Sequence, residues 1–273
     1  MKKLTKSTIK NIFKPRKADS HKGNHGHALI IAGNLGKMGA AVIASKACLR
    51  SGAGLVTVNI PKEERFIIQT ALPEAMVNFR TDLGNDLENY SAIAVGPGLG
   101  LNEGKLILAV FNNSQCPLVL DADALNMLAA DKKLFAKIPT QTIITPHPKE
   151  FDRLFGEHVN YHERILTAVN QAKLLNIIIV LKGDKTIITY NRIVYFNVTG
   201  NAGLAKGGSE NALTGIITAF LAQGYEPFKA AQLGVFMHGL AADLSLKKQS
   251  VESLLITDVI ENMGKAFKSI YPS

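Results

Sequence analysis

The sequence predicts a doubly wound α/β domain, in which helices cover both faces of a largely parallel sheet. Past residue 22, apolar runs of strand length alternate with longer helical patterns, and Gly, Pro, Asn or Asp marks most junctions. The strand-length runs are rich in β-branched residues and lack strict alternation, which is typical of strands covered on both faces. No flexible linker or repeat divides the chain, so we expect one such domain, with ligands beyond the carboxyl ends of its strands.

Each element follows from its local pattern. The expected strands are the apolar runs at residues 27–32, 55–60, 92–95, 118–120, 142–144 and 177–181. The expected helices cover residues 40–50, 62–71, 103–112, 124–136 and 149–175. The first of these helices is apolar or small nearly all round, which predicts a buried helix, and the last is interrupted near Gly156. Two β-rich runs flank Asn191 and predict a hairpin over residues 186–196, and the chain after residue 208 is expected to be mostly helical.

The composition is that of a folded globular protein. Of 273 residues, 47% are hydrophobic and 19% charged, which excludes disordered and collagen-like chains. Cys48 and Cys116 are too few for a disulfide scaffold or a Cys-rich zinc site, and their apolar neighbours predict two buried free thiols. No apolar run approaches the ~18 residues of a membrane helix, and no signal-peptide stretch follows the first lysines. We therefore expect a cytoplasmic protein with no membrane partner.

Positive charge is concentrated at the N-terminus. The formal net charge is +9, and residues 1–22 carry eight Lys or Arg residues against Asp19 alone. We expect a basic N-terminal arm over residues 1–22, either solvated or in contact with another subunit, and the α/β domain over residues 23–273. Basic arms can bind polyanions, but this one lacks the interleaved aromatic residues of single-strand binders, so no nucleic-acid partner is expected.

Two glycine-rich loops follow expected strands. The loop over residues 33–39 (GNLGKMG) precedes a helix and offers free amides at its N-terminus to an anion. The loop over residues 96–100 (GPGLG) lets a ligand approach the backbone closely. A tight packing turn explains either loop equally well, and the first fits neither the G-x-G-x-x-G pattern nor the P-loop.

A pair of carboxylates, Asp121 and Asp123, stands at the junction of a strand and a helix. Asp123 is a candidate helix cap. Alternatively, one of the two carboxylates holds the water shell of Mg²⁺ near phosphates, because Mg²⁺ usually takes only one or two protein carboxylates.

His147 lies between two prolines in the segment TPHPKEF, directly after an expected strand. Prolines fix the backbone around this imidazole, which favours a role in hydrogen bonding a polar ligand or exchanging a proton near neutral pH. A structural role is the alternative. His25 and His27 would point to opposite faces of a strand, so we predict no histidine metal site near the arm.

Two further segments offer groups to an anion. Lys182, Gly183, Asp184, Lys185 and Thr186 follow a strand, and they suit either a phosphate or adenylate ligand or a charged hairpin connection. The segment over residues 200–211 ends in a glycine pair at the start of an apolar helix. The first amides of a helix lack partners and carry the positive end of the macrodipole, so this segment is the most specific local signal for an anion site.

Together these segments resemble the nucleotide-dependent NAD(P)H-hydrate dehydratases, which are ribokinase-like repair enzymes and often form the second half of a bifunctional epimerase–dehydratase. The likeness extends from about residue 15 to residue 270. It rests on seven ordered segments: PRKADSHKGNHGHALIIAG, MGAAVIASKACLRSGAGLVTV, VGPGLG, VLDADALN, TPHPKEF, VLKGDKTII and GNAGLAKGGSENALTGIITAFLAQG.

The resemblance implies that ADP or ATP phosphorylates the hydroxyl of hydrated NADH or NADPH, after which phosphate leaves and the nicotinamide is restored. The implied hydrate-binding residues are Ala40, Gly98, Gly100, His147 and Asn211. The implied nucleotide-binding residues are Lys182 to Thr186 for the adenosine half, and Gly207, Gly208, Ser209 and Glu210 for the phosphates. Asp121 and Asp123 would lie near Mg²⁺ and the polyphosphate. The resemblance further suggests ADP as the nucleotide, a homotetramer, and an epimerase on a separate polypeptide.

One departure from the family pattern concerns catalysis directly. Family members end the signature in Gly-Gly-Ser/Thr-Gly-Asp, whereas this chain has Gly207-Gly208-Ser209-Glu210-Asn211. The Asp accepts the hydroxyl proton as that oxygen attacks phosphorus, and the amide of Asn211 is a poor base, so we expect retained binding with slow turnover. Glu210 places a carboxylate beside an anion hole, and it would be strained if the family's glycine has a positive φ. Conversely, Glu210 could act as a displaced base or help to hold the divalent cation.

Three hypotheses remain open at this point. The chain is a dehydratase of hydrated nicotinamide nucleotides with a reduced rate, a protein that binds nucleotide or hydrated coenzyme without turnover, or a kinase of a small alcohol such as a vitamin precursor. Glu210 and Asn211 are the residues that separate the first two.

Overall fold

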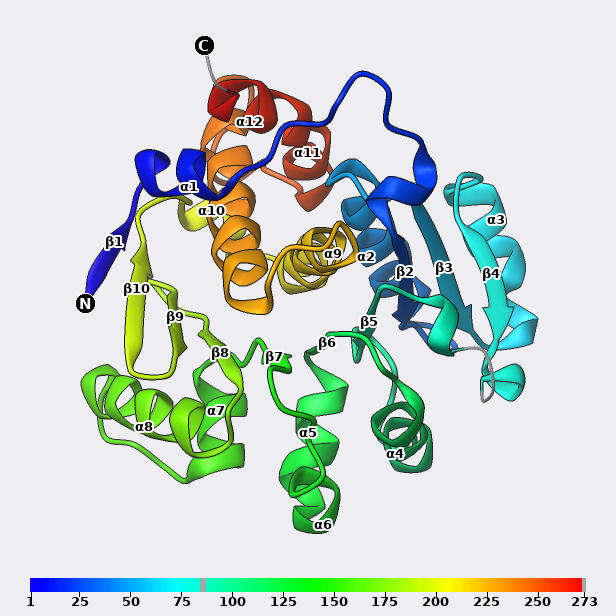
Figure 1. Cartoon of the computed structure of the whole chain (residues 1–273), viewed down its shortest axis with the longest axis horizontal. Coiled ribbons are helices and arrows are strands. Elements are labelled where there is room, and N and C mark those ends of the chain that lie inside the picture. The colour runs from blue at the N-terminus through cyan, green and yellow to red at the C-terminus, as the bar shows by residue number, and fades with distance from the viewer. Residues whose placement is uncertain (84–86, 272–273) are drawn as a thin grey trace.

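A ten-stranded sheet forms the centre of the computed structural model, which describes residues 1–83 and 87–271 (Figure 1). The last two residues of the expected domain, 272 and 273, lie outside the described residues. In chain order the strands are β1 (Lys2–Leu4), β2 (His27–Ile31), β3 (Leu55–Ile60), β4 (Met76–Phe79), β5 (Ala92–Val95), β6 (Leu118–Leu120), β7 (Ile143–Ile144), β8 (Ile178–Leu181), β9 (Ile187–Tyr190) and β10 (Ile193–Asn197).

The sheet is mostly parallel, with the strand order β1-β10-β9-β8-β7-β6-β5-β2-β3-β4. Only β9 runs antiparallel to its neighbours, β8 and β10, among the strands of the described chain. In the middle of the sheet Ile30 of β2 is in register with Val58 of β3 and Ala94 of β5. Most carboxyl ends of the strands therefore lie along one edge of the sheet, where this architecture binds its ligands.

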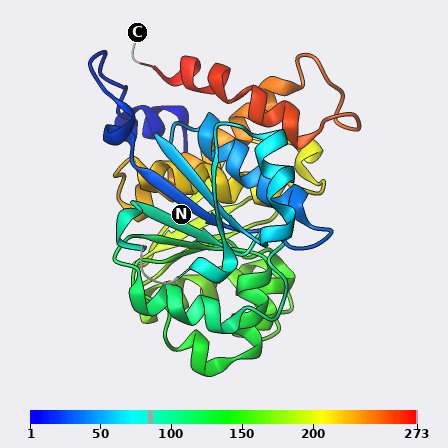
Figure 2. The same ribbon diagram turned by 90° about the vertical axis from the view of Figure 1, so that its right-hand side faces the viewer.

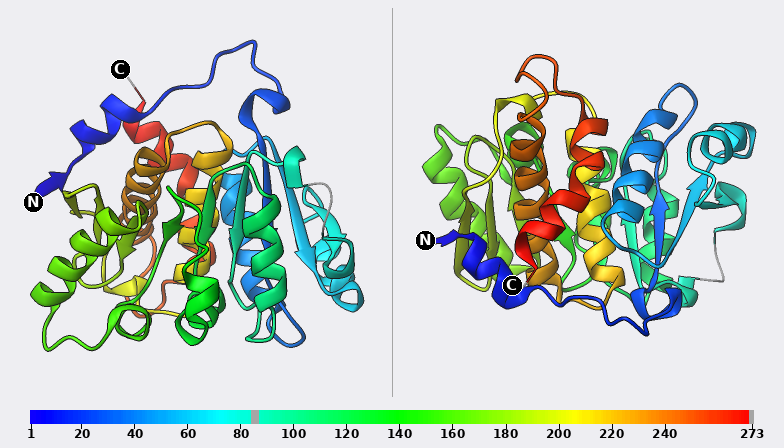
Figure 3. Two further views of the ribbon diagram at one scale, coloured as in Figure 1. Left: turned by 60° about the horizontal axis from the view of Figure 1, so that its bottom comes forward. Right: turned by 90° about the horizontal axis from the view of Figure 1, so that it is seen from above.

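Helices cover both faces of the sheet (Figures 2 and 3). One face carries α1 (Lys6–Ile12), α2 (Met38–Arg50), α3 (Arg65–Ala71), α9 (Ser209–Ala222), α10 (Pro227–Ser245), α11 (Ile256–Glu261) and α12 (Met263–Ile270). The other carries α4 (Gly104–Asn113), α5 (Asp123–Ala130), α6 (Lys132–Phe135), α7 (Pro148–Phe155) and α8 (Tyr161–Leu174). Successive strand residues enter opposite layers: Ala28 and Ile30 pack in the first core, and Leu29 and Ile31 in the second. Strands buried on both faces explain the runs without alternation.

Helix α9 lies close against α2, and this contact sets the position of the candidate site at the start of α9. A Cβ at Gly215 would lie 1.9 Å from the carbonyl oxygen of Ala44, so only glycine permits the two backbones to approach this closely. The largely buried α2 confirms the expectation drawn from its apolar sequence.

The expected doubly wound fold is confirmed, with local differences. The helix expected over residues 124–136 divides at Asp131, whose carboxylate caps α6 by accepting from two backbone amides. The interruption expected near Gly156 is present as the C-cap of α7. Strand β4 was not expected, because it is a short run at the sheet edge with partly exposed side chains. Of the two cysteines, Cys48 is buried and Cys116 only partly buried.

The basic arm expected over residues 1–22 is not separate from the domain throughout its length. Its first twelve residues belong to the domain, because β1 pairs in parallel with β10 and α1 packs against α10 and α12. Leu4 and Ile9 are completely buried. Their burial is not evident from the sequence, because lysines surround these two apolar residues. None of the helices within residues 1–83 and 87–271 is long and apolar enough to cross a membrane.

Candidate active site

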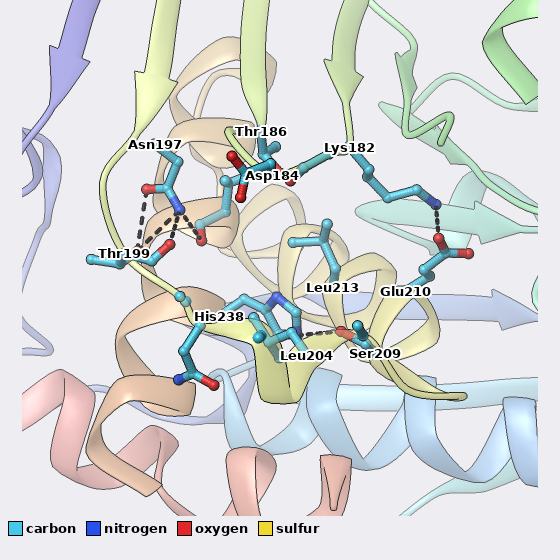
Figure 4. A pocket seen from close by; sticks show the side chains of 17 residues that line it. Lys182, Asp184, Thr186, Asn197, Thr199, Leu204, Ser209, Glu210, Leu213 and His238 are labelled. Atoms are coloured by element: carbon cyan, nitrogen blue, oxygen red, sulfur yellow. Dashed lines mark hydrogen bonds and ion pairs between the residues drawn. The ribbon is translucent and has the colours of Figure 1, made fainter. Parts of the chain in front are cut away.

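A cavity of about 480 Å³ opens where β8 and β10 end and α9 begins (Figure 4). Its lining residues are Lys182, Gly183, Asp184, Thr186, Asn197, Thr199, Gly200, Asn201, Ala202, Leu204, Ala205, Ser209, Glu210, Leu213, Val235, His238 and Gly239. Six residues that the sequence assigned to nucleotide binding are among them: Lys182, Gly183, Asp184, Thr186, Ser209 and Glu210. Lys185, Gly207 and Gly208 are not lining residues.

The start of α9 has the backbone geometry of an anion site. Gly208 is the N-cap residue, and its φ of 92° lies in the region that favours glycine. A Cβ there would also meet Ile43 Cδ1 at 2.7 Å, so the Ile43 side chain would have to move. Helix α9 begins at Ser209, and its first-turn amides carry the positive end of the helix dipole. Glu210 therefore lies inside the helix, and it is not among the described non-glycine residues with positive φ. The strain considered for Glu210 does not arise.

Lys182 is the cation at the floor of this corner. Its Nζ lies 3.0 Å from Asp121 Oδ1, 3.2 Å from Glu210 Oε1 and 3.8 Å from Glu150 Oε2. Burial alone lowers the pKa of Lys182, but the neighbouring carboxylates, led by Asp121 and Glu210, outweigh it and raise the pKa. Lys182 is therefore charged, and one ammonium group serves three carboxylates. Of the three, only Glu210 is substantially exposed, with 42% of its side chain accessible.

Asp121 is a completely buried carboxylate with a partner on each oxygen. Its Oδ1 accepts from Thr145 Oγ1 at 2.8 Å and from Lys182 Nζ at 3.0 Å, and its Oδ2 accepts from Thr214 Oγ1 at 2.8 Å. These donors come from the ends of β7 and β8 and from α9, so Asp121 ties three elements together beneath the cavity. Three donors therefore occupy most of the acceptor positions of this buried carboxylate.

His147 and Glu150 form a capping box at the start of α7. His147 Nδ1 accepts from the backbone amides of Lys149 and Glu150, and Glu150 Oε2 accepts from the amide of His147 at 2.9 Å. Pro148 occupies the first helical position, where its missing N–H costs nothing. Pro148 and His147 therefore have a structural explanation in the capping of α7. The other ring nitrogen, Nε2, lies 3.5 Å from Glu150 Oε1 and can still face a ligand. Burial lowers the pKa of His147, which favours the neutral ring.

The capping carboxylate Glu150 makes folding stability depend on pH. Burial raises the pKa of Glu150 from 4.5 to about 7. A carboxyl whose pKa is raised in the folded state contributes stability that is complete below pH 4.5 and is lost as the pH rises through 7. Urea unfolding of Glu150→Gln is expected to show a smaller loss of stability across this window than the unaltered chain. Glu157→Gln, a substitution of an exposed carboxylate just after α7, should leave the pH profile unchanged. Equal profiles for all three proteins would contradict the assignment.

A second group of predicted residues meets at the ends of β2 and β5. A Cβ on Gly98 would lie 2.9 Å from Ala40 Cβ and 3.0 Å from Lys37 O. The amide of Gly33 donates to Pro97 O at 2.8 Å, so the loops over residues 33–39 and 96–100 are in contact. The amide of Gly100 donates to Asp123 Oδ2 at 2.8 Å, and Lys37 Nζ lies 3.8 Å from the same oxygen. Asp123 is the first residue of α5 and not its N-cap, which is Ala122. The structure thus gathers Ala40, Gly98, Gly100 and Asp123 into one corner.

Asn211 occupies the third position of α9 and is partly buried. Its side chain has no hydrogen-bond partner among residues 1–83 and 87–271, whereas the neighbouring Glu210 carboxylate reaches Lys182. The carboxylate next to Asn211 in the sequence, that of Glu210, is thus held in an ion pair with Lys182.

Several lining residues were not predicted from the sequence. They are Asn197 and Thr199, which precede the segment singled out over residues 200–211, Leu213 of α9, and Val235, His238 and Gly239 of α10. Asn197 donates to Thr199 O, and Thr199 Oγ1 donates to Phe236 O, so side chains fix these two residues to α10. His238 is buried, and burial lowers its pKa to about 4, with a Ser209 Oγ–His238 Nε2 distance of 3.5 Å. The glycines near residue 200 were a usable signal for the segment, but an isolated histidine in an apolar helix gave none.

The chain is similar to known proteins in both sequence and fold. The NAD(P)H-hydrate dehydratase family matches residues 28–265. The chain is 34% identical over 275 residues to the ADP-dependent (S)-NAD(P)H-hydrate dehydratase of Bacillus subtilis, an alignment covering 97% of this chain and 98% of that one. It is 37% identical to the bifunctional NAD(P)H-hydrate repair enzyme Nnr of Escherichia coli over 97% of its own residues and 52% of the relative.

The chain therefore spans about half the length of the bifunctional relatives that it matches. Its structure is similar to that of the B. subtilis ADP/ATP-dependent NAD(P)H-hydrate dehydratase co-crystallised with ATP/Mg²⁺, with a TM-score of 0.88, 31% identity and 99% of each chain covered. Both the sequence match and the fold lead to the same assignment: the chain belongs to the NAD(P)H-hydrate dehydratase family.

Proposed function

We propose that this protein restores NADH and NADPH from their hydrates in a nucleotide-dependent dehydration. The terminal phosphoryl group of ADP or ATP is transferred to the hydroxyl oxygen of the hydrated ring, and the hydroxyl proton is taken up by a base. The ring C–O bond then breaks, phosphate leaves in place of the poorer leaving group water, and loss of a ring proton re-forms the double bond. Family membership and the names of the B. subtilis relatives support this reaction.

The observation that carries the proposal is the cavity at the start of α9, where Lys182 and the helix amides meet. From the sequence, Lys182 was assigned to the adenosine half of the nucleotide. Because its Nζ lies 3.2 Å from Glu210 Oε1, we place Lys182 with the phosphates, together with the turn over residues 207–210, and assign the adenosine half to residues 183–186. The hydrate is assigned to the neighbouring corner formed by Ala40, Gly98 and Gly100, with His147. The helix dipole and backbone amides stabilise charge on the phosphoryl group without reorganising during the reaction.

Mg²⁺ fits this site only as a partner of the nucleotide. The described residues contain no group of three or more His, Cys, Asp or Glu side chains that could hold a metal by themselves. Asp121 is buried and already accepts from three donors, whereas Glu210 offers an accessible carboxylate in the cavity and Asp123 lies at its neighbouring corner. Since Mg²⁺ is usually held by phosphates and one or two carboxylates, Glu210 and Asp123 are the two candidate protein ligands. When bound, the cation neutralises charge on the phosphates.

The Glu210 carboxylate is expected to compete with phosphate for Lys182. Glu210→Gln keeps the shape of the side chain and removes its charge, so ADP should bind about three- to tenfold more tightly in the absence of Mg²⁺. Calorimetric titration measures this change, and Glu252→Gln, at an exposed carboxylate outside the cavity lining, is the matched control. Weaker binding that appears only when Mg²⁺ is present would instead show that Glu210 serves the cation.

The activity itself is tested by restoring the coenzyme. Hydrated NADPH is incubated with the protein, Mg²⁺ and either ADP or ATP, and the absorbance of the restored NADPH is followed. Restoration that requires nucleotide supports the proposal, and the faster nucleotide identifies the donor. Nucleotide consumption with a stable phosphorylated alcohol as the product would support a kinase instead.

Asn211 favours a second candidate function, a protein that binds nucleotide and hydrated coenzyme without turnover. The position that carries the family's proton-accepting Asp here carries an amide, which cannot accept the hydroxyl proton. Calorimetric binding of both ligands, together with no restoration of NADPH, would support this function. Absence of binding to either ligand would exclude both candidates.

Assembly and location remain predictions. The resemblance suggests a homotetramer, and the sequence pattern predicts action in the cytoplasm. Light scattering of the purified protein would give its subunit number directly.

A further inference from the structure

Another hollow lies at the opposite end of α9 from the candidate active site. Its volume is about 390 Å³. Its lining residues are Lys14, Pro15, Arg16, Lys17, Asp19, Ser20, Asn24, His25, Gln223 and Tyr225. Because α9 rises about 1.5 Å per residue between Ser209 and Ala222, roughly 20 Å separate the two sites. The hollow is built from the PRKADSHKGNH segment, to which the proposed dehydration assigns no role.

Its charge is strongly unbalanced. Lys14, Arg16 and Lys17 face Asp19 as the one carboxylate of the lining. Within the part of the chain that the structure describes, none of these three cations has a carboxylate oxygen within 4.0 Å. Burial and then the Arg16 charge lower the pKa of His25, a sign that the local potential is positive.

Hydrogen bonds to the carbonyl groups at the ends of α2 and α9 involve only one of these three cations, Arg16. The Arg16 guanidinium donates to Gly52 O beside the C-terminus of α2, and Gln223 Nε2 donates to Ser51 O at 3.0 Å and to Ala219 O at 2.8 Å. These two side chains satisfy carbonyl groups that would otherwise lack donors. The ammonium groups of Lys14 and Lys17 take no part in those bonds.

We propose that this hollow binds a small anion carrying one or two phosphate groups. Lys14 and Lys17 supply charge-assisted hydrogen bonds, which are stronger than neutral ones. The side chains of Asn24 and Ser20 also line the hollow. The volume lies at the lower end of the range of small-molecule sites. It suits a compact phosphate compound rather than an extended polymer.

The test is calorimetric titration of inorganic pyrophosphate into the full chain without Mg²⁺ and without nucleotide, because ADP carries two phosphates and would compete for the hollow. One pyrophosphate per chain is expected to bind at the hollow, more weakly as salt is added, and any binding at the candidate active site is the part that the charge variants leave unchanged. The double variant Lys14→Gln/Lys17→Glu should weaken binding about 10- to 100-fold through loss of hydrogen bonds to charged groups. Lys10→Gln, an exposed lysine of α1 outside the hollow, should not change it.

Two outcomes would overturn the proposal. The first is the absence of pyrophosphate binding, or binding that both variants weaken equally. The second is binding of short single-stranded DNA without binding of pyrophosphate, which would assign the basic segment to a nucleic acid. Because the charge variants lie far from α9's first turn, their effect also separates this site from the proposed dehydration, which should proceed unchanged in both.

Discussion

Replacing Asn211 with Asp is expected to raise the rate of the proposed NADPH restoration by about 10²–10⁴-fold, the usual contribution of a positioned general base. The side chain keeps its size and its place in the first turn of α9, so the substitution changes proton affinity and little else. A carboxylate is also favourable near a helix N-terminus. The gain should therefore appear in kcat, with the KM for nucleotide nearly unchanged.

An Asn→Asp substitution far from the cavity is the matched control for this experiment. Asn113, an exposed residue at the end of α4, serves this purpose, and Asn113→Asp should leave the rate unchanged. If Asn211→Asp fails to raise the rate, the chain uses another proton acceptor. Glu210 is then the first candidate, and Glu210→Gln in the unaltered chain should abolish the activity.

The sequence was sufficient for the fold because its strands are buried on both faces. Such strands are β-branched runs, and glycine or a carboxylate marks most of their ends, so both the elements and the ligand edge could be located. Strand β1 was not predicted, because it has three residues and two of them are lysines. Its burial depends on β10, nearly two hundred residues further along the chain, and no local pattern records that pairing.

The candidate site was predictable in its parts and not in its connections. The sequence located Asp121, Lys182 and Glu210 on separate segments. In the folded chain the buried ammonium group of Lys182 contacts both Asp121 and Glu210. These contacts depend on tertiary packing, since Lys182 and Asp121 are 61 positions apart in the sequence. The role of His147 as a helix cap also went unseen, because histidine is an uncommon N-cap residue and the capping box is usually recognised from Ser or Thr.

The variant Lys182→Met tests how far the fold depends on this ammonium group. The substitution is expected to reduce the free energy of unfolding by about 3–5 kcal/mol, because removing one partner of a buried ion pair leaves the other charge without compensation. Methionine fills similar volume, so the loss reflects Asp121 and Glu150, which remain buried without a cation. Asp121→Asn in the same chain should recover part of the stability, because it removes the uncompensated charge while retaining an acceptor for Thr145. Lys185→Met removes an exposed charge three residues away and should change stability by less than about 0.5 kcal/mol.

The pH dependence of Lys182→Met distinguishes lost charge compensation from lost packing. The Lys182 charge lowers the pKa of Glu150, which burial raises, so without the ammonium group the pKa of Glu150 rises further in the folded state. Stability contributed by carboxyls with raised pKa values is complete below their unfolded pKa values and falls as the pH increases through the folded ones. The variant should therefore lie closest to the unaltered chain at acid pH and furthest from it above neutrality, as measured by urea unfolding at a series of pH values. A deficit that is constant with pH would mean that Lys182 stabilises the corner by packing alone, and the three carboxylates around it would need another source of compensation.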